Sequence, residues 1–244
     1  MRGKIALVTG ASRGIGRATA LQFARVGAHV VACAQRHVTE VNEVVKEARQ
    51  YGVQAHAILR DVRKKKDVER MVRETLKHFD RIDILVNNAG MGVWATVEET
   101  SEEDFDAMVQ TNFKGVFLCT KAVLPTMIKQ KYGVIINVSS VAGKRAINNL
   151  AVYCGTKYAL DGFSFTLARE VKEHNIRVGV VYPGMVDTHF RESMLSRRPY
   201  TPEERSTMLT PDDVARAIVF MADQEPTSGI DAIEISAPFF TAGR

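Results

Sequence analysis

Short apolar runs alternate with longer amphipathic stretches along the whole chain. The runs are rich in β-branched residues and apolar at nearly every position, a pattern typical of strands that are buried on both faces of a parallel sheet. We therefore predict a strand at each of these runs. They are Ile5–Val8, His29–Cys33, Ala55–Leu59, Ile82–Val86, Val134–Val138, Arg177–Val181 and Ile230–Ile235.

The stretches between the runs carry apolar residues at helical spacing, which predicts helices. These helices are expected at about 15–26, 39–51, 66–79, 101–129, 152–174 and 211–223. The alternation predicts an α/β fold, a doubly wound (Rossmann-type) seven-stranded parallel sheet with helices on both faces and right-handed crossovers. Because neither a linker nor a shift in composition divides the chain, we expect residues 1–244 to form a single domain.

One segment interrupts this alternation between a predicted strand and a predicted helix. Asp187–Leu209 is long and polar and contains two prolines, and loops of this length in compact domains are usually functional or mobile. We expect a substrate lid at 187–209, with a surface excursion as the alternative. Four arginines of this segment are either contacts for an anionic substrate or solvated charges: Arg191, Arg197, Arg198 and Arg205.

The composition is that of a globular protein, since 45% of the 244 residues are hydrophobic and 25% are charged. No apolar run approaches the roughly 20 residues that cross a bilayer, and the N-terminal region lacks the features of a signal peptide. Three widely spaced cysteines argue against a disulfide framework or a zinc site. The six histidines form no ligand spacing such as HxxxH. We expect a cytoplasmic protein without membrane association or a bound metal.

The formal net charge of +5 raises the question of nucleic-acid binding. The densest basic run, Arg60–Arg73, is interrupted by Asp61, Asp67 and Glu69. It also lacks the aromatic residues on which a single-strand binding surface stacks bases. A solvated helix face is the better interpretation, and we expect no nucleic-acid partner. Retention on heparin that collapses with added salt would indicate the alternative.

A glycine-rich turn follows the first predicted strand and leads directly into the first predicted helix. Glycine lets backbone N–H groups approach a pyrophosphate closely, while the helix N-terminus adds a partial positive charge. The place of the turn in the first strand–helix–strand unit predicts a dinucleotide site. The residues expected to contact the cofactor here are Gly10, Ser12, Arg13, Gly14, Ile15 and Gly16.

The spacing of this turn, Gly-x-x-x-Gly-x-Gly, and several later motifs together resemble the short-chain dehydrogenase/reductase family. The later motifs are Asn87-Asn88-Ala89-Gly90, the mid-helix Asn112, Ser140, Tyr153-x-x-x-Lys157 and Pro183-Gly184-x-Val186-x-Thr188. Ser140 precedes Tyr153 by 13 positions, as in the family. The resemblance covers essentially the whole chain. It implies an oxidoreductase that transfers a hydride between a nicotinamide cofactor and a carbonyl or secondary alcohol.

The resemblance also implies roles for individual residues. It implies a catalytic set made of Asn112, Ser140, Tyr153 and Lys157. It further implies that Lys157 contacts the nicotinamide ribose and that Asn112 anchors a chain of water molecules to Lys157. The remaining cofactor contacts that it implies are Asp61, Val62, Asn88, Ala89, Gly90, Tyr153, Lys157, Pro183, Gly184, Val186 and Thr188.

Tyr153 and Lys157 lie one helical turn apart and project from one face of the predicted helix. An unperturbed tyrosine has a pKa of about 10. A nearby ammonium is expected to lower the pKa of Tyr153 toward the working pH, where general acid catalysis is most effective. Tyr153 would protonate the carbonyl oxygen while the Ser140 hydroxyl holds the same oxygen. Without a GxSxG motif, a hydrolase that uses Ser140 as its nucleophile is not supported.

The end of the second predicted strand favours NADP(H) over NAD(H). Ala34 stands where NAD-preferring relatives have an acid for the ribose 2′-hydroxyl, so no carboxylate repels a 2′-phosphate. Arg36, two residues later, and Arg13 in the glycine turn are cations within reach of that phosphate. Gln35 departs from the arginine that strongly NADP-preferring relatives often have at its position.

Within the family, the chain resembles the 3-oxoacyl-carrier-protein reductases and the 3-hydroxy acid dehydrogenases. Our best interpretation is a 3-oxoacyl reductase that acts on a carrier-protein or other thioester. The alternative is a small-molecule carbonyl reductase or 3-hydroxy acid dehydrogenase. Two features favour it: the ending Glu234-Ile235-Ser236-Ala237-Pro238, and a carrier-protein basic pair that is present only as Lys131 and His174. A catalytically silent NADP-binding regulator is a remote alternative. The resemblance also implies a homo-oligomer, either a tetramer or a dimer.

Overall fold

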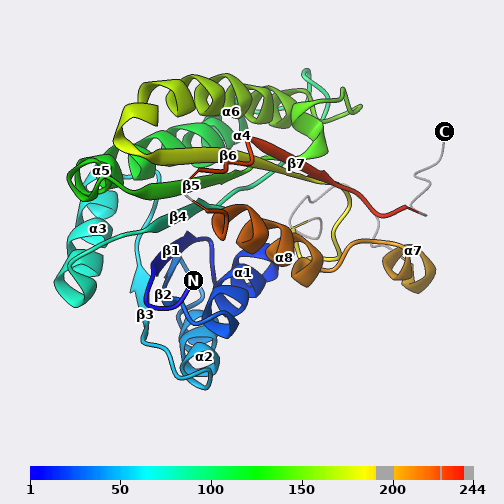
Figure 1. Cartoon of the computed structure of the whole chain (residues 1–244). Coiled ribbons are helices and arrows are strands. Elements are labelled where there is room, and N and C mark those ends of the chain that lie inside the picture. Colours follow the sequence, from blue (N-terminus) through cyan, green and yellow to red (C-terminus); the bar gives the residue numbers. More distant parts are fainter. Residues whose placement is uncertain (191–200, 226, 239–244) are drawn as a thin grey trace.

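Seven strands form one parallel sheet in the computed structural model, which describes residues 1–190, 201–225 and 227–238. Their order across the sheet is β3-β2-β1-β4-β5-β6-β7 (Figure 1), which confirms the predicted doubly wound fold. The strands are β1 (Ile5–Thr9), β2 (His29–Ala34), β3 (Ala55–Leu59), β4 (Ile84–Asn87), β5 (Gly133–Val138), β6 (Ile176–Pro183) and β7 (Ala232–Ile235).

Helices cover both faces of this sheet (Figure 1). One face carries α1 (Gly14–Arg25), α2 (Val38–Arg49) and α8 (Pro211–Ala222), and the other carries α3 (Lys65–Phe79), α5 (Gly115–Gln130) and α6 (Ala151–Glu170). Because successive strand residues point to opposite faces, Ala6 and Val8 of β1 join the first core while Leu7 joins the second. Both faces are buried along β1, β2, β4, β5 and β6, which explains why nearly every position of these strands is apolar. The prediction of burial on both faces is wrong for β7, which lies at the edge of the sheet and is exposed or half-buried at every position.

The chain reverses its direction of travel across the sheet after β3. Strands β2 and β3 lie on one side of β1, while β4 to β7 lie on the other. In open α/β sheets, ligands bind outside the carboxyl ends of the strands at such a switch point. The fold therefore places a ligand site where β1 and β4 end.

The predicted regular helix at 101–129 is wrong at one turn. α4 (Glu102–Val109) passes into the π-helical turn η1 (Gln110–Lys114) before α5 begins. Single π-turns inside helices occur frequently at functional sites. The predicted helix at 152–174 likewise ends earlier, because α6 is followed by the 3-10 turn η3 (Lys172–His174).

A short helix, α7 (Pro202–Ser206), lies within the segment that we predicted to be a lid. The side chain of Thr201 accepts a hydrogen bond from the Glu204 N–H, and the Glu204 side chain accepts one from the Thr201 N–H. Such a capping box satisfies N–H groups that the first turn of a helix leaves free. α8 begins with the same arrangement at Thr210, in agreement with the helix predicted at 211–223, whereas α7 was not predicted.

A completely buried acid, Asp83, joins two neighbouring strands where they begin. Its carboxylate accepts a hydrogen bond from the Ile5 N–H of β1 at 2.9 Å and three from the guanidinium of Arg81. Lys4 adds a longer ion pair at 3.7 Å. The charge is therefore paired within the fold, far from the carboxyl ends of the strands. Within the described ranges, no helix has both the length and the apolar character that crossing a membrane requires.

Candidate active site

A cleft of about 1370 Å³ opens along the carboxyl ends of the strands. Residues that follow β1, β2 and β3 bring Arg13, Arg36 and Arg63 to its wall, while α6 contributes Tyr153 and Lys157. Two of the predicted site residues, Gly16 and Asn112, lie behind the wall. The predicted residues that line the cleft are Gly10, Ser12, Arg13, Gly14, Ile15, Arg36, Asp61, Val62, Asn88, Ala89, Gly90, Ser140, Tyr153, Lys157, Pro183, Gly184, Val186 and Thr188.

The glycine turn requires glycine for two separate reasons. Gly10 and Gly14 have φ angles of +65° and +56°, in the left-handed region that L side chains rarely adopt. A Cβ at Gly16 would overlap the carbonyl oxygen of Gly10 and the side-chain amide of Asn88. The N-cap residue Arg13 makes no side-chain hydrogen bond to α1, which leaves the first-turn N–H groups of α1 to an anion.

Asn88 locks this turn against the end of β4. Its Nδ2 donates to the carbonyl oxygens of Thr9 and Gly10 at 2.9 and 3.1 Å. The Thr9 hydroxyl accepts hydrogen bonds from the N–H groups of Asn88 and Ala89, both at 3.1 Å. These bonds hold the two loops that form the floor of the cleft at a fixed separation.

The wall of the cleft beyond β2 carries positive charge and no acid at its expected position. Ala34 ends β2, and the exposed Arg36 follows it. The Gln35 side chain is engaged with an acid, since its Nε2 donates a hydrogen bond to the Asp61 carboxylate at 2.9 Å. Arg63, which the sequence motifs do not mark, pairs with the same carboxylate at 2.8 Å. Burial acts to raise the pKa of Asp61, but the hydrogen bonds from Arg63 outweigh it and the pKa lies below its usual value.

The other part of the cleft brings Ser140, Tyr153 and Lys157 together. Ser140 follows β5 and begins the 3-10 turn η2 (Val141–Gly143), while Tyr153 and Lys157 lie in α6. The Ser140 hydroxyl lies beside the Tyr153 hydroxyl and acts to lower the pKa of that phenol. The Lys157 Nζ donates to the carbonyl oxygen of Val138 at 2.9 Å and lies 5.7 Å from the centroid of the Tyr153 ring.

Asn112 lies in the π-helical turn η1, behind this group. Its Nδ2 donates to the Met91 carbonyl at 2.8 Å and to the Thr156 hydroxyl at 3.1 Å, and its Oδ1 accepts from the Met91 N–H at 2.8 Å. Asn112 therefore ties the loop after β4 to α6. This arrangement fixes the position of Tyr153 and Lys157 relative to the glycine turn.

Burial shifts the two titratable groups of the site in opposite directions. It raises the pKa of Tyr153 to about 12, although the neighbouring Ser140 hydroxyl acts to lower that pKa. It lowers the pKa of Lys157 to about 8. The expectation that Lys157 lowers the pKa of Tyr153 is wrong for this structure, because burial of the phenol dominates. The phenol therefore keeps its proton at neutral pH and can act as an acid.

The wall around Tyr153 is mostly apolar. Trp94 and Ile147 line the cleft here, and the Phe190 ring lies 5.8 Å from the Tyr153 ring between centroids. No motif in the sequence marks these residues, since their position depends on how three separate loops meet. Their apolar character is the only feature that the sequence offers for finding them, and it does not distinguish residues that line a substrate site from residues of the hydrophobic core.

The segment predicted to be a lid leaves and rejoins the fold at one point. Val186 and Leu209 form an isolated parallel bridge, and the Asp187 N–H donates to the Leu209 carbonyl at 2.9 Å. Arg205 pairs with Asp187, so one of the four lid arginines has an acidic partner within the protein. The other three, Arg191, Arg197 and Arg198, lie outside the described residues.

The side chains of the cleft can bind a dinucleotide and move a proton. Arginine side chains and backbone N–H groups lie in one part of the cleft. The Tyr153 phenol, which can donate a proton, lies in the other part beside the buried ammonium of Lys157. In the described part of the chain, no group of three or more His, Cys, Asp or Glu side chains is arranged to hold a metal ion. All three cysteines are buried free thiols.

Comparisons with known proteins agree with this geometry. A family model described as short chain dehydrogenase matches residues 4–199. A 3-oxoacyl-[acyl-carrier-protein] reductase of Synechocystis is 40% identical over 222 residues, which cover 90% of this chain and 89% of that protein. A metagenomic short-chain oxidoreductase in complex with NADP has a TM-score of 0.83 at 32% identity and 96% coverage of both chains. A 3-ketoacyl-(acyl-carrier-protein) reductase from Brucella melitensis, complexed with NADH, has a TM-score of 0.88 at 31% identity, covering 98% of this chain and 99% of that one.

Proposed function

Because the chain belongs to the short-chain dehydrogenase family, we propose that it is an NADP(H)-dependent reductase of 3-oxoacyl thioesters. The observation that carries the proposal is one cleft in which the glycine turn, Ser140, Tyr153 and Lys157 meet. Family membership makes the protein an oxidoreductase that acts on carbonyl or CH–OH groups. The finer assignment, to a thioester on a carrier protein or another thiol, is supported by the name of the Synechocystis relative.

The residues of the cleft fit a nicotinamide dinucleotide, which would supply the hydride. The left-handed backbone at Gly10 and Gly14 and the open N-terminus of α1 suit a pyrophosphate. Arg13 and Arg36 suit a 2′-phosphate, because no acid stands at the end of β2 to repel it. Gly16 supports this site from behind the wall by close packing, and Asn88, which lines the cleft, supports it by hydrogen bonds to the turn.

Negative charge develops on the oxygen of a carbonyl as it is reduced. Tyr153 donates its hydroxyl proton to that oxygen, and Ser140 holds the same oxygen through a hydrogen bond. The high pKa of Tyr153 keeps this proton in place before the reaction, and the Lys157 ammonium stabilises the phenolate that remains. Asn112 acts through Met91 and Thr156, because its hydrogen bonds to them fix the loop and the helix that carry the site.

The preference for NADPH over NADH should depend on Arg36. Replacing Arg36 with alanine removes a charged partner of the 2′-phosphate, and a hydrogen bond to a charged group contributes about 1.5–3 kcal/mol. We expect kcat/KM for NADPH to fall roughly 10- to 100-fold while kcat/KM for NADH changes little. The exposed Arg70 of α3 does not line the cleft, so Arg70→Ala is the matched control. Equal losses with both cofactors in Arg36→Ala would contradict the assignment.

The substrate class is tested by a panel of NADPH-oxidation assays at one pH. Acetoacetyl thioesters, free 3-oxo acids, diketones and aldoses are compared. The proposal predicts that the thioesters give the highest kcat/KM. A response to free 3-oxo acids or diketones without thioester turnover would instead favour the second candidate, a small-molecule carbonyl reductase or 3-hydroxy acid dehydrogenase. The mostly apolar wall formed by Trp94, Ile147 and Phe190 favours this second candidate, since a compact carbonyl compound could pack against it.

The segment 187–209 is proposed as the substrate lid. Its described part supports this role, because Phe190 packs on the Tyr153 ring and Glu204 lines the cleft. The bridge between Val186 and Leu209 holds the two ends of the segment together beside the cleft, so that the segment can cover the site.

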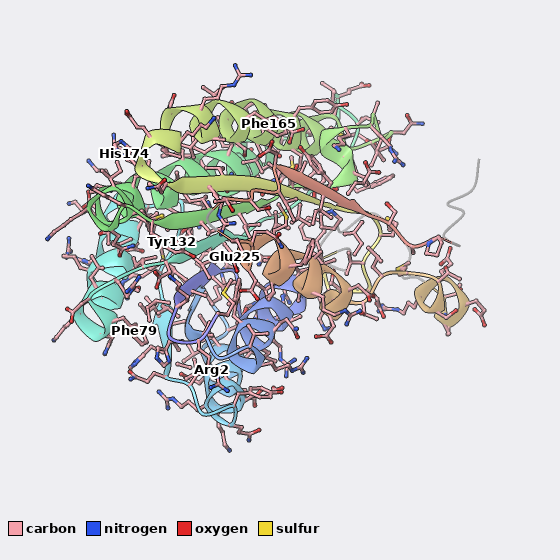
Figure 2. All side chains as sticks on the ribbon, viewed as in Figure 1. Arg2, Phe79, Tyr132, Phe165, His174 and Glu225 are labelled. Atoms are coloured by element: carbon pink, nitrogen blue, oxygen red, sulfur yellow. The ribbon has the colours of Figure 1, made fainter. Side chains whose placement is uncertain are left out.

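A homo-oligomer, either a tetramer or a dimer, is proposed from exposed aromatic residues on α4 to α6. Phe165 lies on α6 (Figure 2) and is 43% exposed, and Phe117 and Tyr158 are similarly exposed. Light scattering should give a mass of two or four times the 27.1 kDa of one chain, and Phe165→Glu should shift it toward 27.1 kDa. Wild-type protein of 27.1 kDa would contradict this proposal. The cytoplasmic location and the lack of a nucleic-acid partner stay predictions.

A further inference from the structure

Behind the active site lies a group of charged and polar side chains that the proposed reaction does not use. Asp161 follows Lys157 by one turn on the same face of α6. Tyr182 of β6 is completely buried, and its hydroxyl lies beside the Asp161 carboxyl. The Lys144 Nζ lies 4.1 Å from the centroid of the Tyr182 ring and 3.6 Å from a carboxylate oxygen of Glu234 on β7.

The carboxyl of Asp161 is poorly satisfied by hydrogen bonds. Its Oδ1 is buried and has no well-formed hydrogen bond from any residue that the structure describes, and the same holds for the neighbouring Tyr182 hydroxyl. Burial raises the pKa of Asp161, while the Tyr182 hydroxyl, Lys144 and Lys157 act to lower it. A buried acceptor without a partner costs about 1–3 kcal/mol. No hydrogen bond from a described residue to Oδ1 offsets this cost. The carboxylate charge of Asp161 does, however, act on neighbouring groups.

Lys157 is the neighbour on which this charge acts. Its side chain is almost completely buried, and its Nζ donates to a neutral acceptor, the carbonyl oxygen of Val138. Burial lowers the pKa of Lys157, and the negative charge of Asp161 acts to raise it. The Asp161 carboxylate therefore favours the charged form of the ammonium.

Other charges around α6 are neutralised or distant. On α6 itself, Tyr153 is protonated at neutral pH, and the segment after η2 carries Lys144 and Arg145, both paired with Glu234. η1 presents the neutral Asn112, and the charged residues of η3 lie at the far end of α6. α4 contributes the buried Met108. The acids of α4 that are exposed to solvent are Glu102, Glu103 and Asp106.

We propose that Asp161 is a positioning residue that keeps the Lys157 ammonium charged for carbonyl reduction. Its kinetic consequence rests on the proposed function. Its effect on the charge of Lys157 does not, because that effect is present in the protein without cofactor or substrate.

The direct test is the titration of Lys157 in the ligand-free protein. Lysine labelled with ¹³C at Cε is followed by NMR, and the Lys157 signal is assigned by its loss in Lys157→Gln. We expect the titration midpoint to fall by about one pH unit in Asp161→Asn and to stay near the wild-type value in Asp161→Glu. Glu234→Gln is the matched control, since it neutralises an acid that pairs with Lys144 and Arg145 rather than Lys157. It should leave the midpoint unchanged.

The same shift should appear in the pH profile of the reductase. If Lys157 must be charged for catalysis, its lower titration midpoint in Asp161→Asn shifts the alkaline decrease of kcat to a pH about one unit lower. The loss of activity relative to wild type is then roughly tenfold at pH 9 and small at pH 6. Circular dichroism checks folding, and Asp161→Ser serves as a second neutral variant if Asp161→Asn does not fold.

Three outcomes separate this inference from the proposed function. An unchanged Lys157 midpoint in the neutral Asp161 variants overturns the inference, and so does an equal shift in Glu234→Gln. A shifted midpoint in a protein that reduces no thioester supports the inference and overturns the proposed function.

Discussion

Replacing Tyr153 with phenylalanine is expected to lower kcat for carbonyl reduction by about 10²- to 10⁴-fold, the usual contribution of a general acid. The substitution removes the hydroxyl that lies beside Ser140 and leaves the ring against Phe190. NADPH affinity should change much less than kcat, because the glycine turn and Arg36 are untouched. Steady-state NADPH oxidation gives the first quantity and quenching of protein fluorescence by the cofactor gives the second.

A control variant lies on the same helix. Tyr158 is 49% exposed on α6, so Tyr158→Phe should keep wild-type turnover. Turnover of Tyr153→Phe equal to wild type would contradict the assigned acid. It would favour the alternative in which the protein binds NADP(H) as a regulator without doing chemistry.

Replacing Asp83 with alanine is expected to lower the free energy of unfolding by about 3 kcal/mol or more. The change leaves the buried Ile5 N–H without its acceptor and removes the shared anionic partner of Arg81 and Lys4. For a chain of this length, such a loss corresponds to a decrease in Tm of roughly 6–12 °C. Differential scanning calorimetry measures it.

Asp83→Asn separates the two contributions of this carboxylate. The amide oxygen can still accept from Ile5, but the charge opposite Arg81 is lost, so we expect an intermediate loss of stability. Asp106 is exposed on α4, and Asp106→Ala should change stability by about 0.5 kcal/mol at most. A Tm of Asp83→Ala within the range of that control would contradict the structural role of Asp83.

The strands were the most predictable part of the fold. Runs such as Val134–Val138 and Ile5–Val8 are apolar at every position or nearly so, and a sheet covered on both faces requires this pattern. The π-helical turn at Gln110–Lys114 was not predictable in the same way. It has apolar residues at ordinary helical spacing, and its extra residue per turn depends on how Asn112 bonds to Met91 and Thr156.

Within the candidate site, residues carried by local motifs were predictable, and residues brought together by the fold were not. The glycine turn and the pair Tyr153 and Lys157 each depend on short sequence spacing. Gln35 follows β2 and reaches Asp61, which follows β3, so no local pattern shows that Gln35 is engaged there. The pKa of Tyr153 depends on burial by several loops, which is why the expected decrease became an increase.

The central claim, hydride transfer from NADPH to the carbonyl carbon of a 3-oxoacyl thioester, is tested most directly with NADPH deuterated at C4 of the nicotinamide. Acetoacetyl thioester is incubated separately with each C4 epimer of the labelled cofactor, and the product is examined by mass spectrometry and NMR. We expect one epimer to place a single deuterium on C3 of the 3-hydroxybutyryl product. A product without deuterium from either epimer, or no NADPH consumption with any thioester, would contradict this claim.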